Sequence, residues 1–358
     1  MNAPKQKRGL DGRSRRIYLN GKWLAQSTTG TQRYATEIAR RLVARLGDRI
    51  TIVTPKGVDL PDWTAGATIR RSRLTGNSFE QFVLPIVTFG QYLLNLSGSS
   101  PLFKRKQGIV LFDASVFRYG DTFSWMFTRW YRLLYRTARY RSEQLFTISR
   151  FSRDELAEVL RIEPARLHVI PCGADHLPDP TGRYTAPIST PYVVMIGSLT
   201  ERKNLSGPLT EFARRGIRTA VVGAGGRSSV FAHSGIPDDE HIVPLGRLDD
   251  AEIVDLLAGA TAMVFPSLYE GFGLPIVEAQ RVGCPVVCAN SSSLPEAAGD
   301  GALFFDPNYP SAAADEVESL LVDAHLRTHL QARGYANVIP RSWESSADQL
   351  FRIIEGGD

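Results

Sequence analysis

Two glutamates, Glu270 and Glu278, bracket a glycine-containing loop and are the residues of this chain best suited to do chemistry. The segment reads Glu-Gly-Phe-Gly-Leu-Pro-Ile-Val-Glu and follows an apolar run at 263–265. Two glycines let a ligand approach the backbone closely, and the proline suits the first turn of a helix. A helix that begins after such a loop, at the carboxyl end of a strand, offers free N–H groups to an anion. We therefore predict an anion site here, with Glu270 facing a cleft.

The second glutamate is expected to bind a diol. We place Glu278 in the first turn of a helix over 274–282, where the helix dipole favours a carboxylate. A carboxylate there can accept two hydrogen bonds from a vicinal diol such as a ribose. The alternative is a glycine-rich turn before a well-capped helix, with both glutamates solvated.

A second segment supplies positive charge. Arg202 and Lys203 stand in Gly-Ser-Leu-Thr-Glu-Arg-Lys-Asn at 197–204, directly after an apolar run at 192–196. Such cations can neutralise a diphosphate leaving group; the alternative is an exposed basic turn. Glycines also follow the run at 219–222. Because Ser228 stands where the third glycine of the dinucleotide fingerprint belongs, this turn argues against a nicotinamide-dependent oxidoreductase.

Strand-like runs alternate with amphipathic segments, which predicts parallel sheets with right-handed crossovers. Further apolar runs lie at 17–19, 50–53, 109–112, 145–148, 167–170, 242–244 and 286–289. Helical spacing is clearest over 31–46, 152–160, 249–257, 274–282 and 343–354. In the second of these helices we take Ser152 as N-cap, with Glu155 completing a capping box.

The predicted fold class is α/β, with two facing Rossmann-like domains, parallel sheets and a cleft between them. A stretch with five prolines at 171–191 is the expected linker. We divide the chain into a basic disordered arm at 1–16, an N-terminal domain at 17–172 and a C-terminal domain at 173–342. A helix within 343–356 is expected to join the N-terminal domain.

Composition excludes several classes of protein. The 358 residues include 42 Lys and Arg against 37 Asp and Glu, and 43% are hydrophobic, which excludes wholesale disorder, collagen and coiled coil. Cys284 and Cys288 lie in an apolar run that favours buried thiols over a zinc site. A zinc enzyme through His325 and His329 is disfavoured because no third ligand accompanies them.

The charge pattern and hydropathy also bound the partners and the location. Basic residues are dispersed, so we expect no nucleic-acid partner. The most apolar stretch, at 82–96, is shorter than the roughly 20 residues of a membrane span. We therefore expect a cytoplasmic protein.

The loop from Glu270 to Glu278 resembles the paired-glutamate motif of the retaining glycosyltransferases of family 4, or group 1, which have the GT-B fold of two facing Rossmann-like domains. The resemblance runs from about residue 18 to residue 354. Weaker similarities are the Arg-Lys-Asn turn at 202–204, the interdomain crossing at 170–175 and the glycine turn at 29–34. The resemblance implies an acceptor side in the N-terminal domain and a nucleotide-sugar donor side in the C-terminal domain.

The resemblance also implies roles for single residues. Glu278 would hold the donor ribose and Glu270 would lie against the donor sugar. Lys203, helped by Arg202, would stabilise the departing diphosphate. The remaining donor-binding positions implied are the backbone at Gly30, Gly271, Phe272, Gly273 and Leu274, and Ser198, which stands where many members have Arg. The family needs no divalent metal and no other cofactor.

One departure from the family bears on catalysis. Phe112 precedes Asp113 where relatives often have His-Asp, and in the family that His lies near the reacting carbon. Asp113 remains as a group that could serve an acceptor hydroxyl or cap a strand end. The substitution favours, as an alternative, a degenerate subunit that binds a donor without turning it over. A sugar-nucleotide epimerase of the same fold is the other alternative.

Residues 123–141 interleave aromatic side chains with five arginines. A basic, aromatic helix can lie on an anionic membrane, which would suit a lipid-linked saccharide acceptor. The alternative is a helix whose aromatic stripe packs on the first sheet. The expected function is transfer of a sugar from a UDP- or GDP-sugar to a saccharide or lipid-linked acceptor in polysaccharide or lipopolysaccharide biosynthesis, with peripheral contact at the inner membrane face as an option.

Overall fold

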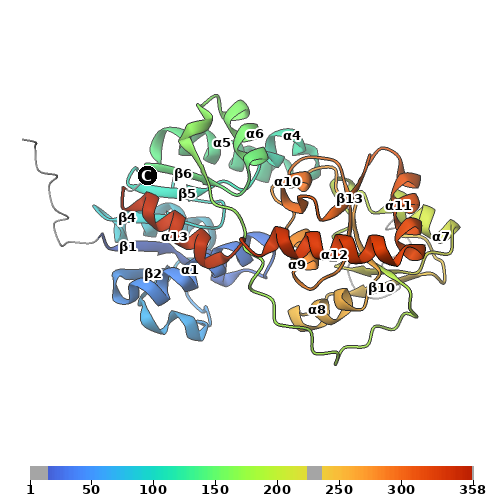
Figure 1. Cartoon of the computed structure of the whole chain (residues 1–358). Coiled ribbons are helices and arrows are strands. Elements are labelled where there is room, and N and C mark those ends of the chain that lie inside the picture. Colours follow the sequence, from blue (N-terminus) through green and yellow to red (C-terminus); the bar gives the residue numbers. More distant parts are fainter. Residues whose placement is uncertain (1–14, 224–235, 357–358) are drawn as a thin grey trace, which may run out of the picture.

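A computed structural model describes residues 15–223 and 236–356, so residues 1–14 of the arm predicted at 1–16, and the segment with Gly225, Gly226 and Ser228, lie outside the described residues. The chain forms two lobes, each built on a parallel sheet (Figure 1). The seven-stranded N-terminal sheet has the order β3-β2-β1-β4-β5-β6-β7. Its strands are β1 (Ile17–Asn20), β2 (Ile50–Thr54), β3 (Thr68–Arg71), β4 (Tyr92–Asn95), β5 (Gln107–Val110), β6 (Gln144–Thr147) and β7 (Leu167–Val169).

The six-stranded C-terminal sheet has the order β10-β9-β8-β11-β12-β13. Its strands are β8 (Val193–Ile196), β9 (Thr219–Val222), β10 (Ile242–Gly246), β11 (Ala262–Phe265), β12 (Val286–Ala289) and β13 (Ala302–Phe305). The strand order reverses beside β1 and beside β8, and ligands of such sheets bind at the carboxyl ends of the strands near that reversal. The predicted α/β class with two parallel sheets is confirmed.

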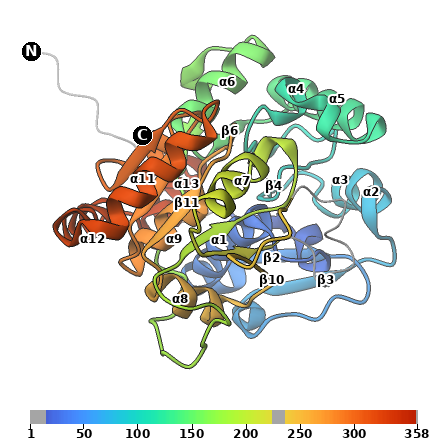
Figure 2. The ribbon, with the colours of Figure 1, turned by 90° about the vertical axis from the view of Figure 1, so that its right-hand side faces the viewer.

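Helices connect the strands and cover the sheets (Figures 1 and 2). They are α1 (Gly30–Leu46), α2 (Gly76–Ser78), α3 (Leu84–Val87), α4 (Ser115–Arg118), α5 (Trp125–Arg141), α6 (Arg150–Leu160), α7 (Ser206–Arg214), α8 (Asp250–Ala258), α9 (Leu274–Arg281), α10 (Leu294–Ala298), α11 (Pro310–Val322), α12 (Ala324–Val338) and α13 (Trp343–Ile354). The predicted N-cap of α6 is wrong. Ser149 is the N-cap and accepts the Ser152 N–H at 2.9 Å, so the helix begins at Arg150.

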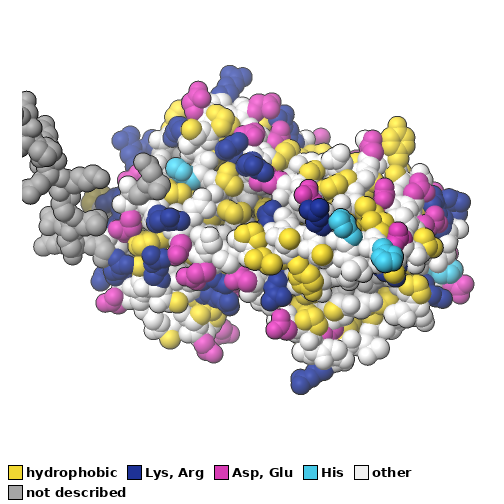
Figure 3. All heavy atoms as spheres, in the orientation of Figure 1, with side chains coloured by type: hydrophobic (Ala, Val, Ile, Leu, Met, Phe, Trp, Pro, Cys, Tyr) yellow, Lys and Arg dark blue, Asp and Glu magenta, His cyan; other side chains and the backbone are white. Residues whose placement is uncertain are grey.

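The chain crosses between the lobes twice, and α13 ends on the N-terminal lobe while α12 covers the C-terminal one (Figure 1). Trp343 and Leu350 of α13 share one apolar cluster with Tyr34 of α1. Phe272 and Val277 of the C-terminal lobe belong to the same cluster. The core of the N-terminal lobe is therefore continuous with the contact between lobes. On the face that α12 and α13 cover, acidic and basic side chains are interspersed (Figure 3).

The expected linker contains no helix or strand, yet part of it is firmly held. The Asp255 carboxylate of α8 accepts the backbone N–H groups of Thr181, Gly182, Arg183 and Tyr184 at 2.6–3.0 Å. These backbone hydrogen bonds hold the pKa of the Asp255 carboxyl well below its usual range. The linker is thereby fastened to the C-terminal lobe.

Three sequence-based expectations concern membranes, cysteines and metals. In the described part of the chain no helix combines the length and the apolar character needed to cross a bilayer. Cys284 and Cys288 are buried free thiols, and burial raises the pKa of Cys284 to about 12. Within residues 15–223 and 236–356, no three His, Cys, Asp or Glu side chains are grouped to hold a metal ion, and this includes His325 and His329 of α12.

Candidate active site

A cavity of about 1200 Å³ lies between the lobes. The N-terminal lobe lines it with the first turn of α1 and the segment after β5, and the C-terminal lobe with the loops after β8, β9 and β11. Of the residues singled out from the sequence, the structure brings these to the cavity wall: Gly30, Asp113, Arg202, Lys203, Glu270, Gly271, Phe272, Gly273, Leu274 and Glu278.

Ser198 is the exception. Its side chain is exposed, its Oγ lies 3.4 Å from Thr200 Oγ1, and it is not part of the cavity wall. The reason is local. The stem of Lys203 folds back over Gly197, so that a Cβ built on this glycine would be 3.6 Å from Lys203 Cδ. The Lys203 side chain therefore packs over Gly197 and lines the cavity, and the contribution of Ser198 to donor binding stays a prediction.

Lys203 and Arg202 converge on Glu270. Lys203 Nζ lies 2.5 Å from Glu270 Oε1, and Arg202 Nη1 lies 3.5 Å from Glu270 Oε2. Arg202 also donates to the carbonyl of Tyr269 at 2.7 Å. All three charged side chains are at least three-quarters buried. Two cations around one carboxylate give this cluster a net positive charge, which suits a diphosphate.

Asn204 explains why the cations are presented in this way. It adopts a left-handed conformation with φ 51°, which asparagine tolerates better than most residues. Its Nδ2 donates to the carbonyls of Pro266, after β11, and Pro307, after β13. The Arg-Lys-Asn turn is therefore tied to the ends of two strands, β11 and β13, which lie on either side of β12. Sequence reasoning noted the asparagine but gave it no function.

The two glycines of the glutamate loop have different functions. A Cβ on Gly271 would lie 2.8 Å from the carbonyl oxygen of Phe112, so only glycine fits between the lobes here. The Gly271 carbonyl accepts hydrogen bonds from the buried hydroxyls of Ser149 (2.6 Å) and Ser152 (2.8 Å). Gly273 has φ 100°, which turns the chain into α9. Sequence reasoning assigned Ser152 only to a helix cap and missed Ser149, because nothing in their spacing points to a loop more than a hundred residues away.

Glu278 does not lie in the first turn of α9. The helix begins at Leu274, which puts Glu278 in the second turn, where the helix dipole acts more weakly. Its orientation comes instead from His176, whose Nε2 lies 3.0 Å from Glu278 Oε1. His176 was missed as well, since a single histidine in a proline-rich linker carries no recognisable signal.

The N-terminal lobe offers a helix terminus and a cation. Gly30 is the first residue of α1, and nothing lies within 4 Å of where its Cβ would be. The free N–H groups of this 17-residue helix thus open towards the cavity. Arg33, in the same turn, forms an ion pair with Asp250 of α8 across the cavity. This bridge between lobes was not anticipated.

Phe112 and Asp113 line the cavity, and both side chains make structural contacts. The Phe112 ring packs edge-on against Tyr34 with centroids 5.4 Å apart. Asp113 Oδ1 accepts the Ser115 N–H at 2.7 Å, which caps the turn that leads into α4. Nearby, burial and the charge of Glu278 raise the pKa of the Cys172 thiol well above its usual range. Cys172 is therefore a neutral thiol and no nucleophile.

Comparison with models of protein families identifies the family of this chain. Residues 108–176 match the family model described as Glycosyltransferase Family 4, and residues 183–337 match that of Glycosyl transferases group 1. The chain belongs to the group 1 glycosyltransferases of family 4. An O-antigen chain mannosyltransferase B of Escherichia coli is 31% identical over 233 residues. That match covers 59% of this glycosyltransferase chain, which spans 60% of the length of the relative.

Solved structures show the same two-lobed GT-B fold over nearly the whole chain. Sucrose-phosphate synthase from Thermosynechococcus elongatus superposes with a TM-score of 0.75 at 17% identity, covering 96% of this chain and 99% of its own. Anabaena HepE, solved in complex with UDP-glucose, superposes with a TM-score of 0.69 at 15% identity, covering 94% and 98%. At these identities the likeness concerns the fold.

Proposed function

We propose that this protein is a retaining hexosyltransferase that moves a sugar from a UDP- or GDP-sugar to a saccharide or lipid-linked saccharide acceptor in polysaccharide or lipopolysaccharide biosynthesis. The observation that carries the proposal is the convergence of Lys203, Arg202 and Glu270 with Glu278 and two helix N-termini in one cavity between the lobes. The family and the O-antigen relative support the reaction class, and the resemblance to retaining members supports retention.

The cavity contains a group for each part of such a donor. The N-terminus of α1 and the Arg202–Lys203 pair flank the space for a diphosphate, and Glu278 is placed to accept hydrogen bonds from ribose hydroxyls. Fixed cations in a cleft that excludes water act most strongly where negative charge develops, which is on the leaving diphosphate. The proposal assigns no metal ion and no other cofactor to this reaction.

Thermal unfolding in the presence of UDP, GDP, ADP and NAD tests the donor site. A ligand at 100 times its Kd should stabilise the protein by roughly 2.7 kcal/mol. We expect one diphosphate to do so, and Glu278→Ala to abolish the effect. Glu318→Ala, which removes an exposed carboxylate of α11 far from the cavity wall, should retain it.

The other outcomes separate the alternatives. Stabilisation by NAD alone, or by none of the four, would contradict the proposal. If a nucleoside diphosphate stabilises the protein but the corresponding nucleotide sugar is not turned over, the degenerate donor-binding subunit is favoured. Phe112, in the place of the family histidine, keeps that second candidate open, because its ring can neither accept nor donate a proton.

We further propose that the N-terminal lobe contacts an anionic membrane. The buried residues of α5 are Thr128, Leu134, Tyr135 and Ala138, and Trp130 and Tyr131 pack half-buried against the same core. Part of the aromatic set thus packs inward, as the alternative expects, and the rest is exposed. Along its exposed face, at helical spacing, lie Trp125, Arg129, Leu133, Arg136 and Tyr140.

A second exposed apolar group lies in and around α3, which Figure 2 shows on the same side of the lobe as α5. It consists of Phe82, Ile86, Phe89 and Phe103, each at least 66% exposed. The backbone N–H of Leu102 donates to Gln81 Oε1 at 2.9 Å. Leu102 and Trp130 of α5 both pack against the apolar cluster that contains Leu134, so the loop that carries Leu102 is anchored to the core beneath α5. Apolar side chains mixed with arginines match the interface of an anionic bilayer.

Sedimentation with lipid vesicles tests the membrane contact. We expect binding to phosphatidylcholine vesicles that contain phosphatidylglycerol, and little binding to phosphatidylcholine alone. Arg129→Glu with Arg136→Glu should weaken binding at least about tenfold, since each basic residue near such a surface contributes about 1 kcal/mol. Arg214→Glu with Arg333→Glu changes the net charge equally, on the exposed surface of the other lobe, and should bind normally. Equal weakening by both pairs would contradict a defined contact face.

A further inference from the structure

The His176 side chain is fully buried and both of its ring nitrogens are engaged. The indole Nε1–H of Trp343 donates to His176 Nδ1 at 3.1 Å. On the other side of the ring, Nε2 lies 3.0 Å from Glu278 Oε1. The three residues thus form a chain of hydrogen bonds from the first residue of α13, through the linker, to the cavity wall.

The chemistry of the indole fixes the proton of the imidazole. An indole N–H can only donate, so Nδ1 must present its lone pair. The ring proton therefore lies on Nε2, and this N–H donates a hydrogen bond to the Glu278 carboxylate. Had Nδ1 carried the proton, two donors would face each other and the carboxylate would face a lone pair.

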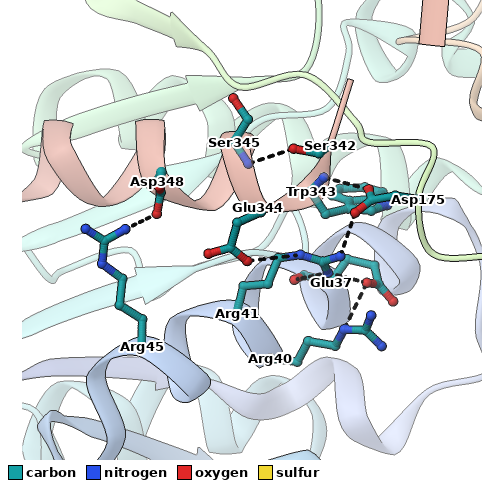
Figure 4. Close-up of polar contacts among 10 residues, drawn as sticks. All are labelled: Glu37, Arg40, Arg41, Arg45, Asp175, Ser342, Trp343, Glu344, Ser345 and Asp348. Atoms are coloured by element: carbon teal, nitrogen blue, oxygen red, sulfur yellow. Dashed lines mark hydrogen bonds and ion pairs between the residues drawn. The ribbon is translucent and has the colours of Figure 1, made fainter. Parts of the chain in front are cut away.

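Trp343 itself is held by several contacts. Its backbone N–H donates to Asp175 Oδ1 at 2.8 Å, and Asp175 Oδ2 lies 3.1 Å from Arg41 Nη2 of α1 (Figure 4). A Cβ on Gly173 would lie 2.3 Å from the Trp343 nitrogen, so the crossing packs directly against the start of α13. The indole is fully buried and meets the Tyr34 ring edge-on. It therefore has one available orientation.

We infer that His176 and Trp343 are positioning residues that set the rotamer of Glu278 for binding the ribose diol of the donor. This inference rests on the proposed function. Glu278 lies in the second turn of α9, beyond the strongest influence of the helix dipole, so the imidazole is what orients its carboxylate. Among the described residues only Oε1 has a hydrogen-bond partner, which leaves Oε2 for the ligand.

The arrangement links ribose binding to the place where the chain returns from α12 to α13 and the N-terminal lobe. Glu278 belongs to the C-terminal lobe, whereas Trp343 is packed on the N-terminal lobe through α1. Donor affinity should then depend on how α13 sits on the opposite lobe. In metal sites, the hydrogen-bond partner of a histidine ligand fixes the tautomer and orientation of that ring. Here Trp343 does the same for His176, which in turn orients a carboxylate.

The test compares each nucleoside diphosphate with its 2′,3′-dideoxy counterpart, using UDP or GDP, whichever binds the wild-type protein. The dideoxy compound lacks the two hydroxyls that Glu278 would bind. We expect His176→Phe to weaken binding of the ordinary diphosphate about tenfold, as for one lost hydrogen bond to a charged group. Binding of the dideoxy compound should change less than about twofold, since it makes no such bond.

Further variants distinguish positioning from general damage. His176→Gln retains a side-chain N–H donor and should recover part of the ribose preference. Trp343→Phe retains an aromatic ring but loses the donor that fixes the tautomer, and should lower the preference in the same direction. Trp23→Phe is the matched control, because this equally buried indole donates to Thr36 Oγ1 outside the cavity and should leave the preference unchanged.

The outcomes separate this inference from the proposed function. If wild-type protein binds neither diphosphate, or binds both forms equally, the proposed donor site or the assignment of Glu278 is wrong. If wild-type protein prefers the ribose form and His176→Phe keeps that preference, the positioning inference is overturned. If His176→Phe does not fold, an unchanged preference in both His176→Gln and Trp343→Phe overturns it.

Discussion

Replacing Lys203 with alanine should lower kcat/KM for sugar transfer by about 100- to 1000-fold. Removing one preorganised donor from a site of developing negative charge typically raises the barrier by roughly 2.7–4 kcal/mol, and each 1.36 kcal/mol corresponds to about a factor of ten. Lys203 is suited to this function because it is four-fifths buried, so water screens its charge poorly. The measurement is steady-state turnover of the donor that the nucleotide screen identifies.

The contact with Glu270 makes the Lys203 experiment more specific. Lys203 Nζ is held by Glu270 Oε1. After the substitution, Arg202 is the cation that still pairs with Glu270 among the described residues. Arg214→Ala removes a cation from the same lobe but from the exposed end of α7, and should leave kcat/KM unchanged. If Lys203→Ala also leaves kcat/KM unchanged, its assigned function is wrong.

The residues that surround the cavity differ in how far the sequence revealed them. Glu270, Lys203 and the glycine loop follow strand-like runs directly, so their arrival at one sheet edge could be predicted from the alternation of strands and helices. Their partners could not. Ser149 contacts the glutamate loop and His176 contacts α9, each more than a hundred residues away, and no local spacing encodes such long-range contacts.

Two kinds of local error have physical causes. The edge strand β3 is mostly exposed and reads Thr-Ile-Arg-Arg, so it lacks the apolar run of a buried strand and was missed. β13, at the edge of the other sheet, is only half buried and was missed too. The second half of 82–96, the most apolar stretch of the sequence, contains the central strand β4. The start of α9 at Leu274 agrees with the prediction, but four residues precede Glu278 in the helix, so placing this glutamate in the first turn was wrong.

The exposed surface of α5 shows a further limit of prediction from the sequence, which is the choice of the buried face of a helix. The sequence predicted a helix there, and α5 occupies Trp125–Arg141. Which face is buried depends on the neighbouring strands and on α6, and the aromatic residues are numerous enough to supply either face. The structure divides them between the core and the surface, a division that periodicity alone does not fix.

Gly271→Ala should impair both stability and turnover. The added methyl group would meet the backbone oxygen of Phe112 at 2.8 Å, and this contact cannot be relieved by rotating a side chain. Overpacking of this kind costs about 1–3 kcal/mol. Moving the loop would also strip the buried hydroxyls of Ser149 and Ser152 of their acceptor, at about 1–3 kcal/mol for an unsatisfied buried group.

The effect on activity follows from the position of the loop. Gly271 directly follows Glu270, so a displacement of about 1 Å misplaces the donor sugar and can cost about 100-fold in rate. Gly30→Ala is the control for stability, because its Cβ meets nothing within 4 Å and a helical alanine should, if anything, stabilise the protein. Thermal unfolding and kcat/KM of both variants provide the comparison. A Gly271→Ala protein with unaltered stability and turnover would show that the lobes do not approach this closely in the working enzyme.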